Sequence, residues 1–215
     1  MDMISMDMRP MDSRSKDLND IELVMMAKAA HDDRAFATLV RRHQARLRAF
    51  LRRLCANNAL ADDIAQETFM KAHAALAGFK SGGSFRSWLY AIAYREFLQD
   101  ARKAKAAARL EDALRQDATH NADDRLEAGM SLDIRRALAT LDEKERAAVL
   151  LCDAAGFSHN EAALALDTPL GSVKTYVARA RQKLRDHLAN SPAKAADVAP
   201  DTKPDPTLNG VCYAF

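Results

Sequence analysis

The chain has 215 residues, enough for one or two small domains, and its 32 Lys and Arg nearly balance its 30 Asp and Glu. With only 7 Gly, 6 Pro and 6% aromatic residues, its composition is typical of a mostly helical protein. No run of about 18 apolar residues occurs, so we expect no membrane span. The Met- and Asp-rich N-terminus lacks the basic and apolar regions of a secretory signal, and we expect a cytoplasmic protein.

The cysteines do not form a recognisable pattern. Cys55, Cys152 and Cys212 are odd in number and widely spaced, which predicts neither a disulfide framework nor a zinc site. The C-terminal CYAF matches a prenylation signal only loosely, because Tyr213 is not aliphatic and no polybasic run precedes it. We therefore expect no metal, cofactor or lipid anchor.

The first helical unit is expected over residues 17–107, after a disordered segment at 1–16. Asn19 or Asp20 is a candidate N-cap for its first helix. A second helix follows Asp33, and its apolar residues recur at three- and four-residue steps. This helix carries six arginines and no acid over residues 36–55, typical of a surface that faces a polyanion: Arg41, Arg42, Arg46, Arg48, Arg52 and Arg53.

After a break at Asn57 and Asn58, another helix presents polar side chains on neighbouring turns: Asp62, Asp63, Gln66 and Glu67. Paired carboxylates can form a metal or acid–base site, but no His, third acid or Gly-rich loop accompanies them. A protein-binding face is the favoured interpretation.

A further helix, starting at Phe85, is apolar on two faces. One face holds Phe85, Trp88, Leu89 and Ile92, and the opposite one holds Tyr90, Tyr94, Phe97 and Leu98. Such a helix needs two partners. One is the domain core, and the other is either a neighbouring helix or unstacked nucleic-acid bases, for which aromatics beside Arg and Lys are suited.

The composition changes over residues 108–130. Six acids and two bases lie between Glu111 and Glu127, and apolar periodicity is weak there, which predicts a flexible acidic linker. A second helical unit is expected over 131–190. The tail at 191–215 is Pro-rich and expected to be disordered.

The second unit has the pattern of a helix-turn-helix. One helix ends at Gly156, Ser158 and Glu161 are spaced as a capping box for the next, and the turn DTPLG precedes a last helix. The last helix has an apolar stripe that we expect to face the core: Val173, Val177, Ala180, Leu184 and Leu188.

The other faces of this last helix are basic, with five Lys or Arg between Lys174 and Arg185 and no acid. An ordinary solvated face usually mixes signs, so DNA binding is favoured. The first turns of such a helix reach base edges, which places Lys174, Thr175 and Arg179 to read sequence. Further along the helix, Arg181, Lys183 and Arg185 are placed for the phosphate backbone.

Two blocks of sequence together resemble one family. ADDIAQETFMKAH with SFRSWLYAIAYREFLQDARK, and then LDEKERAAVLLCDAAGFSHNEAALALDTPLGSVKTYVARARQKL, resemble the extracytoplasmic-function (group IV) sigma factors of the bacterial sigma-70 family. These proteins keep only regions 2 and 4. The resemblance covers about residues 20–106 and 131–188, and the chain departs from the family's frequent Asn and Asp at Arg95 and Gln99.

The resemblance implies roles for specific residues. The face expected to dock on the β′ clamp helices of core RNA polymerase comprises Asp62, Asp63, Gln66, Glu67 and Phe69. The residues expected to melt or recognise the −10 element are Arg86, Trp88, Tyr90, Tyr94, Arg102, Lys103 and Lys105. Those expected at the −35 element are Ser172, Lys174, Thr175, Arg179, Arg181 and Lys183.

The resemblance also implies partners: promoter DNA, the β flap of core polymerase and an anti-sigma factor. By the same resemblance, the acidic linker would run through positive polymerase channels; the alternative is that it folds back over the basic helices.

A stand-alone helix-turn-helix regulator is the second hypothesis for the whole chain, but it would need a dimerisation element and leaves the first unit unexplained. No P-loop, nucleophile elbow or zinc pattern indicates an enzyme.

Overall fold

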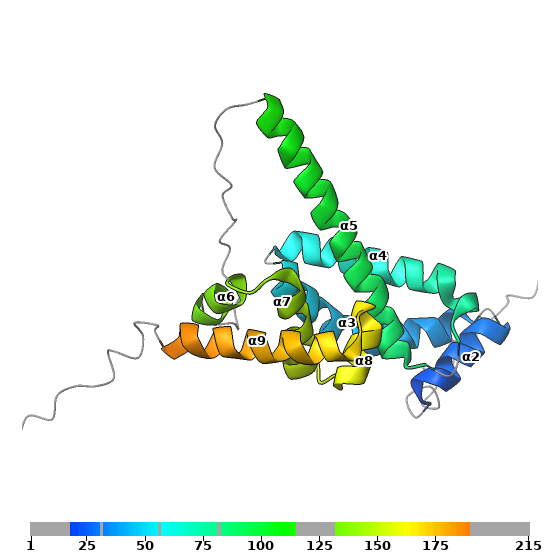
Figure 1. Ribbon diagram of the computed structural model, residues 1–215. Coiled ribbons are helices and arrows are strands. Elements are labelled where there is room, and N and C mark those ends of the chain that lie inside the picture. The colour runs from blue at the N-terminus through cyan, green and yellow to red at the C-terminus, as the bar shows by residue number, and fades with distance from the viewer. Residues whose placement is uncertain (1–17, 31, 56, 81–82, 115–131, 190–215) are drawn as a thin grey trace, which may run out of the picture.

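The computed structural model describes residues 18–30, 32–55, 57–80, 83–114 and 132–189, and all regular structure within them is helical (Figure 1). The prediction of an all-α protein with two helical units is confirmed. The segments expected to be disordered, at 1–16 and 191–215, lie outside the described residues, as does most of the predicted linker.

The first unit contains α2 (Asp20–Ala30), α3 (Asp33–Cys55), α4 (Asn58–Ala75), the single turn η1 (Leu76–Gly78) and α5 (Phe85–Leu114). The long helix α3 packs on both α2 and α4, and α5 crosses α4. The core of the first unit lies between these helices, and its fully buried side chains include Leu39, Leu47, Leu51 and Leu89. Burial of such side chains contributes about 2 kcal/mol each and sets the arrangement of the helices.

Polar caps fix where the first helices begin. Asn19 and Glu22 form a reciprocal pair, in which each side chain accepts a hydrogen bond from the other's backbone N–H, at 2.9 and 2.7 Å. Asn57 caps α4 by accepting from the backbone N–H of Leu60. Asp20 then holds α2 to α3, because its carboxylate contacts His43 Nε2 at 2.8 Å and Arg42 Nη1 at 2.6 Å. The hydrogen bond with His43 lowers the pKa of Asp20.

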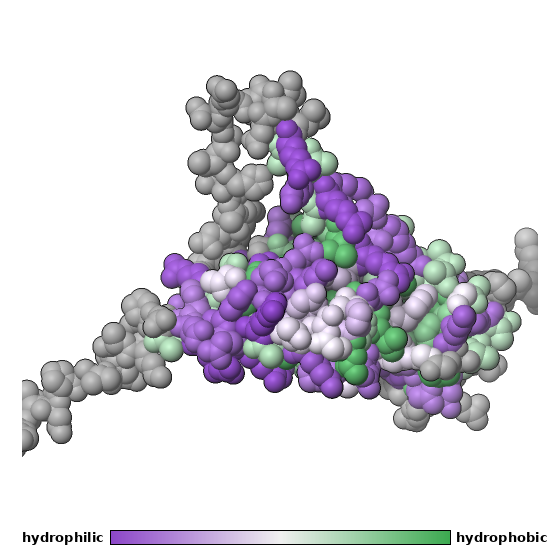
Figure 2. Space-filling view, viewed as in Figure 1, coloured by the Kyte–Doolittle hydropathy of each residue, from purple (hydrophilic) through white to green (hydrophobic). Residues whose placement is uncertain are grey.

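Helix α5 is longer than the sequence suggested. The first unit was predicted to end at residue 107, whereas α5 continues to Leu114, seven residues into the predicted linker. Its C-terminal half projects away from the rest of the molecule (Figure 1), and Figure 2 shows this half as mostly hydrophilic. Thirty residues of helix span about 45 Å, so the projecting half carries its residues well clear of the first unit's core.

The second unit contains α6 (Leu132–Ala139), α7 (Glu143–Val149), the π-helical turn η2 (Leu150–Ala154), α8 (His159–Leu166) and α9 (Leu170–Ala189). The predicted capping box of Ser158 and Glu161 is present at the start of α8. The predicted stop at Gly156 is also present, with φ of 71°. The turn after α8 begins at Asp167, whose φ of 48° ends that helix. The π-helical turn was not predicted.

The apolar stripe of α9 faces the core only in part. Val173, Val177 and Ala180 are buried and Leu184 is half-buried, as predicted. Leu188 is 43% exposed, so the prediction was wrong there. The reason is length: α9 has 20 residues, while α6, α7 and α8 have 8, 7 and 8, so the end of α9 extends beyond the helices that cover it.

The two units pack against each other. Helix α5 lies along α8, and α3 contacts both α7 and η2 (Figure 1). We call this interface between the two units the seam. Arg146 of α7 lies in it and donates hydrogen bonds to the carbonyl oxygens of Leu138 and Leu141 in the second unit and of Leu54 in the first. The linker therefore joins two units that are already in contact.

Candidate functional site

The carboxylate face of α4 is divided between internal and outward-facing side chains. Asp62 lies 3.2 Å from Arg52 of α3, and Glu67 lies 3.3 Å from Lys71 on its own helix. Asp63 and Gln66 are exposed, and Phe69 is half-buried beside them. Asp63 and Gln66 are therefore the polar members of this predicted face that are most accessible to a partner.

Lys71 adds a cation to the edge of the same face. Its ammonium group contacts Glu96 of α5 at 2.5 Å as well as Glu67, and the hydrogen bond to Glu96 raises the pKa of Lys71. Glu67 thus belongs to a charge network that holds α4 to α5. Of the predicted docking residues, Asp62 and Glu67 have this second, structural contact.

The two apolar faces of α5 both find protein partners. Trp88 lies in the first unit, with its ring centroid 5.2 Å from that of Phe79. Tyr90 and Tyr94, on the opposite face, are only 1% and 5% exposed. Burial raises the pKa of both phenols to about 12, so they stay protonated at neutral pH. The second face of α5, which the sequence left open between a helix and bases, is covered here by the second unit.

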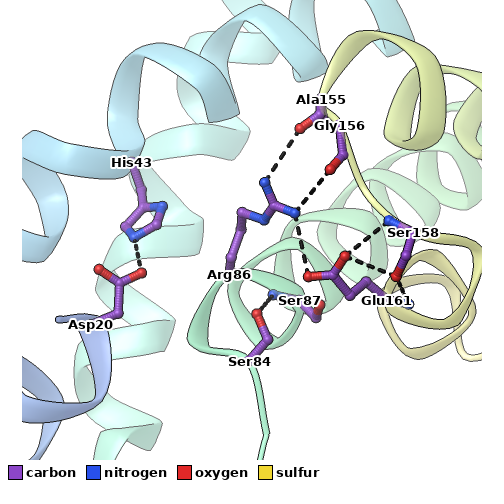
Figure 3. A network of polar contacts seen from close by, with 9 residues as sticks. All are labelled: Asp20, His43, Ser84, Arg86, Ser87, Ala155, Gly156, Ser158 and Glu161. Carbon is purple, nitrogen blue, oxygen red and sulfur yellow. Dashed lines mark hydrogen bonds and ion pairs between the residues drawn. The ribbon is translucent and has the colours of Figure 1, made fainter.

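Arg86 is the centre of this covered face (Figure 3). Its guanidinium donates hydrogen bonds to the carbonyl oxygens of Ala155 and Gly156 at 3.4 and 3.2 Å, and forms an ion pair with Glu161 at 3.3 Å. The carboxylate of Glu161 also accepts from the backbone N–H and the hydroxyl of Ser158. These bonds, with that from the Ser158 backbone the largest cause, lower the pKa of Glu161.

The predicted −10 residues consequently do not form one surface. Arg86, Tyr90 and Tyr94 face the second unit and Trp88 packs in the first. The three basic residues at the far end are exposed on the projecting half of α5: Arg102, Lys103 and Lys105. The sequence did not predict Phe157 and Glu161 as partners of this face, because no pattern in the residues around them indicates a contact with α5.

The predicted −35 residues divide along α9. Lys174, Thr175 and Arg179 are exposed, and the Thr175 hydroxyl donates to the carbonyl of Gly171 at 3.0 Å; Ser172 is half-buried. Arg181 instead makes two hydrogen bonds to Asp153, at 2.6 and 3.0 Å. Lys183 contacts Glu145, a buried carboxylate, at 2.6 Å. The last two cations therefore have partners within the second unit.

The Lys183–Glu145 contact gives a stability prediction. Lys183→Met should destabilise the second unit by about 1–2 kcal/mol, because Glu145 is 2% exposed and would lose the charged donor that compensates its burial. Thermal unfolding of the full chain measures this. Arg185→Met is the control, since Arg185 is exposed and donates a hydrogen bond to the exposed side chain of Gln182, and it should change stability by less than about 0.5 kcal/mol. Equal stabilities would show that Lys183 has no structural role.

Within the described residues, no group of three or more His, Cys, Asp or Glu is arranged to hold a metal ion. In the same residues, no helix combines the length and apolar character that a membrane span requires. The side chains of α4, α5 and α9 described above form ion pairs and aromatic contacts.

Comparison with known proteins accounts for both units. Residues 39–107 match the family Sigma-70 region 2, and residues 131–184 match Sigma-70, region 4. The sequence is 34% identical over 170 residues to the ECF RNA polymerase sigma factor EcfG of Rhodopseudomonas palustris, covering 77% of this chain and 88% of EcfG. The chain belongs to the extracytoplasmic-function sigma factors of the sigma-70 family. The resemblance seen in the sequence is thereby confirmed.

Other sigma factors of this family match over similar lengths. SigE of Mycolicibacterium smegmatis is 33% identical over 166 residues, which cover 75% of this chain and 64% of SigE. The sigma factor RpoE of Bartonella quintana, solved with the anti-sigma factor NepR, superposes with a TM-score of 0.61 at 30% identity, over 73% of this chain and 98% of RpoE. CnrH, solved with the cytosolic domain of CnrY, gives 0.61 at 31% identity, over 80% and 99%. The helical arrangement is thus shared with solved sigma factors.

Proposed function

We propose that this chain binds core RNA polymerase and directs it to promoters that carry the −35 and −10 elements it recognises. The observation that supports this most is the presence of two different binding surfaces in one chain. In the first unit, α4 exposes Asp63 and Gln66. In the second unit, α9 is the last helix of a helix-turn-helix and exposes Lys174, Thr175 and Arg179. Membership of the sigma factor family supports the same conclusion. The chain itself catalyses no reaction; it gives polymerase its choice of promoter.

The two docking surfaces follow from this role. The α4 face would contact the β′ clamp helices, and region 4 would contact the β flap. Lys174, Thr175 and Arg179 would read the −35 element in the major groove, since they are exposed on the first turns of α9. The projecting basic end of α5 would lie against the −10 element. The place of action is the cytoplasm, beside polymerase.

An anti-sigma factor is the expected regulator. RpoE of Bartonella quintana was solved in complex with the anti-sigma factor NepR. This chain shares its fold, and we propose that a protein of the same class holds this chain away from polymerase.

The base-reading role of α9 gives a second prediction. Arg179→Ala should cost about 1–3 kcal/mol at the preferred −35 sequence and much less at other sequences, because a base contact is lost. Arg185→Ala should weaken all sequences alike and reduce the salt slope by about one, as loss of a phosphate contact does. Binding of duplex DNA to the full chain at several salt concentrations measures both. A uniform loss with Arg179→Ala would make Arg179 a phosphate contact.

Transcription from a defined promoter tests the function as a whole. The purified chain is mixed with core RNA polymerase and promoter fragments, and specific transcripts are expected only when both proteins are present. A stand-alone regulator would bind DNA without core and yield no core-dependent transcript. That result would overturn the proposed function.

A further inference from the structure

The arginines of α3 divide into those that pair with acids of the first unit and those that line a cavity. Arg42, Arg48 and Arg52 form ion pairs with carboxylates of the first unit, at 2.6, 3.6 and 3.2 Å. Arg46 and Arg53 instead line a cavity of about 370 Å³ at the seam, between α3 and the η2 turn. Contacts within the first unit therefore account for only part of the basic pattern on this helix.

Arg46 and Arg53 lie on one face of α3, two helical turns apart. Seven residues of helix rise about 10 Å, and Ala49 and Phe50 line the cavity between the two arginines. Arg53 donates a hydrogen bond to the carbonyl oxygen of Ala49 at 3.2 Å. Among the residues that the structure describes, neither Arg46 nor Arg53 forms an ion pair. Both guanidinium groups therefore keep N–H donors for a ligand.

The acids beside the cavity already have cationic partners. Asp153 lines the cavity, but both of its carboxylate oxygens accept hydrogen bonds from Arg181. Arg86 also lines the cavity, and it forms an ion pair with Glu161 at 3.3 Å. These two pairs neutralise each other's charges. The positive charge of the two α3 arginines remains uncompensated, which favours an anionic ligand.

The remaining walls of the cavity are largely apolar and come from both units. Phe50 of α3 and Leu150 of η2 are 3% and 4% exposed, and Ala154 and Ala155 complete the wall on the side of the second unit. A concave site of this size, with apolar walls and a few convergent charged groups, is typical of a small-molecule site. A single phosphate group would fill only part of it.

We propose that this cavity binds a nucleoside polyphosphate, with its phosphates between Arg46 and Arg53 and its base against the apolar wall of Phe50 and Leu150. A chain of phosphates carries charge along its length, which suits two guanidinium groups spaced along one helix face. Because both units form the site, the bound ligand stabilises the seam. This proposal does not depend on the proposed function.

Calorimetric titration of the full chain with ATP and with GTP measures the binding. Arg46→Gln and Arg53→Gln should each weaken it by about tenfold or more, because each removes charge-assisted hydrogen bonds. Arg41→Gln is the matched control on the same helix. Arg41 is exposed, donates to the Thr38 hydroxyl at 2.8 Å and does not line the cavity, so its loss should leave affinity unchanged. Equal weakening in all three variants would overturn the proposal.

A second pair of variants tests whether the ligand lies inside the seam. Ala154→Trp adds a large side chain to the cavity wall without changing charge, and it should weaken ATP binding by at least about tenfold. Ala139→Trp makes the same change at an exposed position of α6 and should have no effect. Normal ATP binding by folded Ala154→Trp would place the anion outside the cavity and overturn the proposal.

The choice of probe tests the class of ligand. Tripolyphosphate lacks the part that would contact the apolar wall, so it should bind about tenfold more weakly than ATP or GTP, and orthophosphate more weakly still. Equal affinity for tripolyphosphate and both nucleotides would overturn the assignment to a nucleotide.

Thermal unfolding tests the stabilisation of the folded chain. ATP at ten times its Kd should raise the Tm of the wild type by about 4 °C, and that of Arg46→Gln by less than half as much at the same concentration. Absence of ATP and GTP binding to the folded wild type would overturn the proposal. Core-dependent transcription, measured on the same protein, tests the proposed function separately.

Discussion

Asp63→Lys should lower the affinity for core RNA polymerase by about 100-fold, equivalent to about 3 kcal/mol. Asp63 is exposed on the α4 face, and among the described residues it is not a member of the ion pairs that Asp62 and Glu67 form. Reversing its charge should therefore repel the partner surface without disturbing the helix. Titration of labelled full chain with core polymerase measures the change.

The matched control is Asp33→Lys, which makes the same charge change in the same unit. Asp33 is 89% exposed, and its ion-pair partner is His73. This variant should bind core as the wild type does. If Asp63→Lys unfolds at the normal temperature yet binds core with normal affinity, the α4 face is not the polymerase contact.

Arg146→Ala should destabilise the second unit by about 3 kcal/mol and lower its Tm by more than about 10 °C. The guanidinium donates to Leu138 O at 2.9 Å, Leu141 O at 3.1 Å and Leu54 O at 3.3 Å. Its loss leaves three carbonyl oxygens without this charged donor. Because Leu54 belongs to α3, the seam should loosen as well.

Calorimetry measures the expected loss of stability. Fluorescence energy transfer between one dye on each unit measures the expected loosening of the contact between the units. Arg136→Ala is the control, since Arg136 is an exposed arginine on the neighbouring helix α6 and its removal should have little effect. A stability loss without a change in energy transfer would confine the role of Arg146 to the second unit. No loss at all would contradict the prediction.

The local features of this fold could be predicted because their causes lie within a few residues. Ser158 and Glu161 predicted the start of α8, and Gly156 predicted the end of the helix before it. The spacing of Val173, Val177 and Ala180 predicted which side of α9 is buried, and each of these side chains is buried. The stripe failed at Leu188, because periodicity does not report how far the covering helices extend.

The contacts that divide the candidate site could not be predicted in this way. Lys183 and Glu145 are 38 residues apart, and Arg86 and Glu161 are 75 apart. Such pairs depend on how helices cross, which charge patterning along one helix does not report. Lys183 therefore looked like a phosphate contact on a basic face, although its ammonium group is held by a buried carboxylate.

The number of residues in the π-helical turn η2 determines how the chain that follows it, including Phe157, is oriented towards α5. In η2 the backbone N–H of Ala155 bonds to the carbonyl of Leu150, five residues earlier, so this turn holds one residue more than an α-helical turn. Deleting the exposed Ala154 would allow the turn to rewind as α-helix and would rotate the chain after it by about 100°. Phe157 would then point away from Arg86. A single-codon deletion would thus remove the contacts of Phe157 with Arg86 and Tyr90 without changing any of these three side chains.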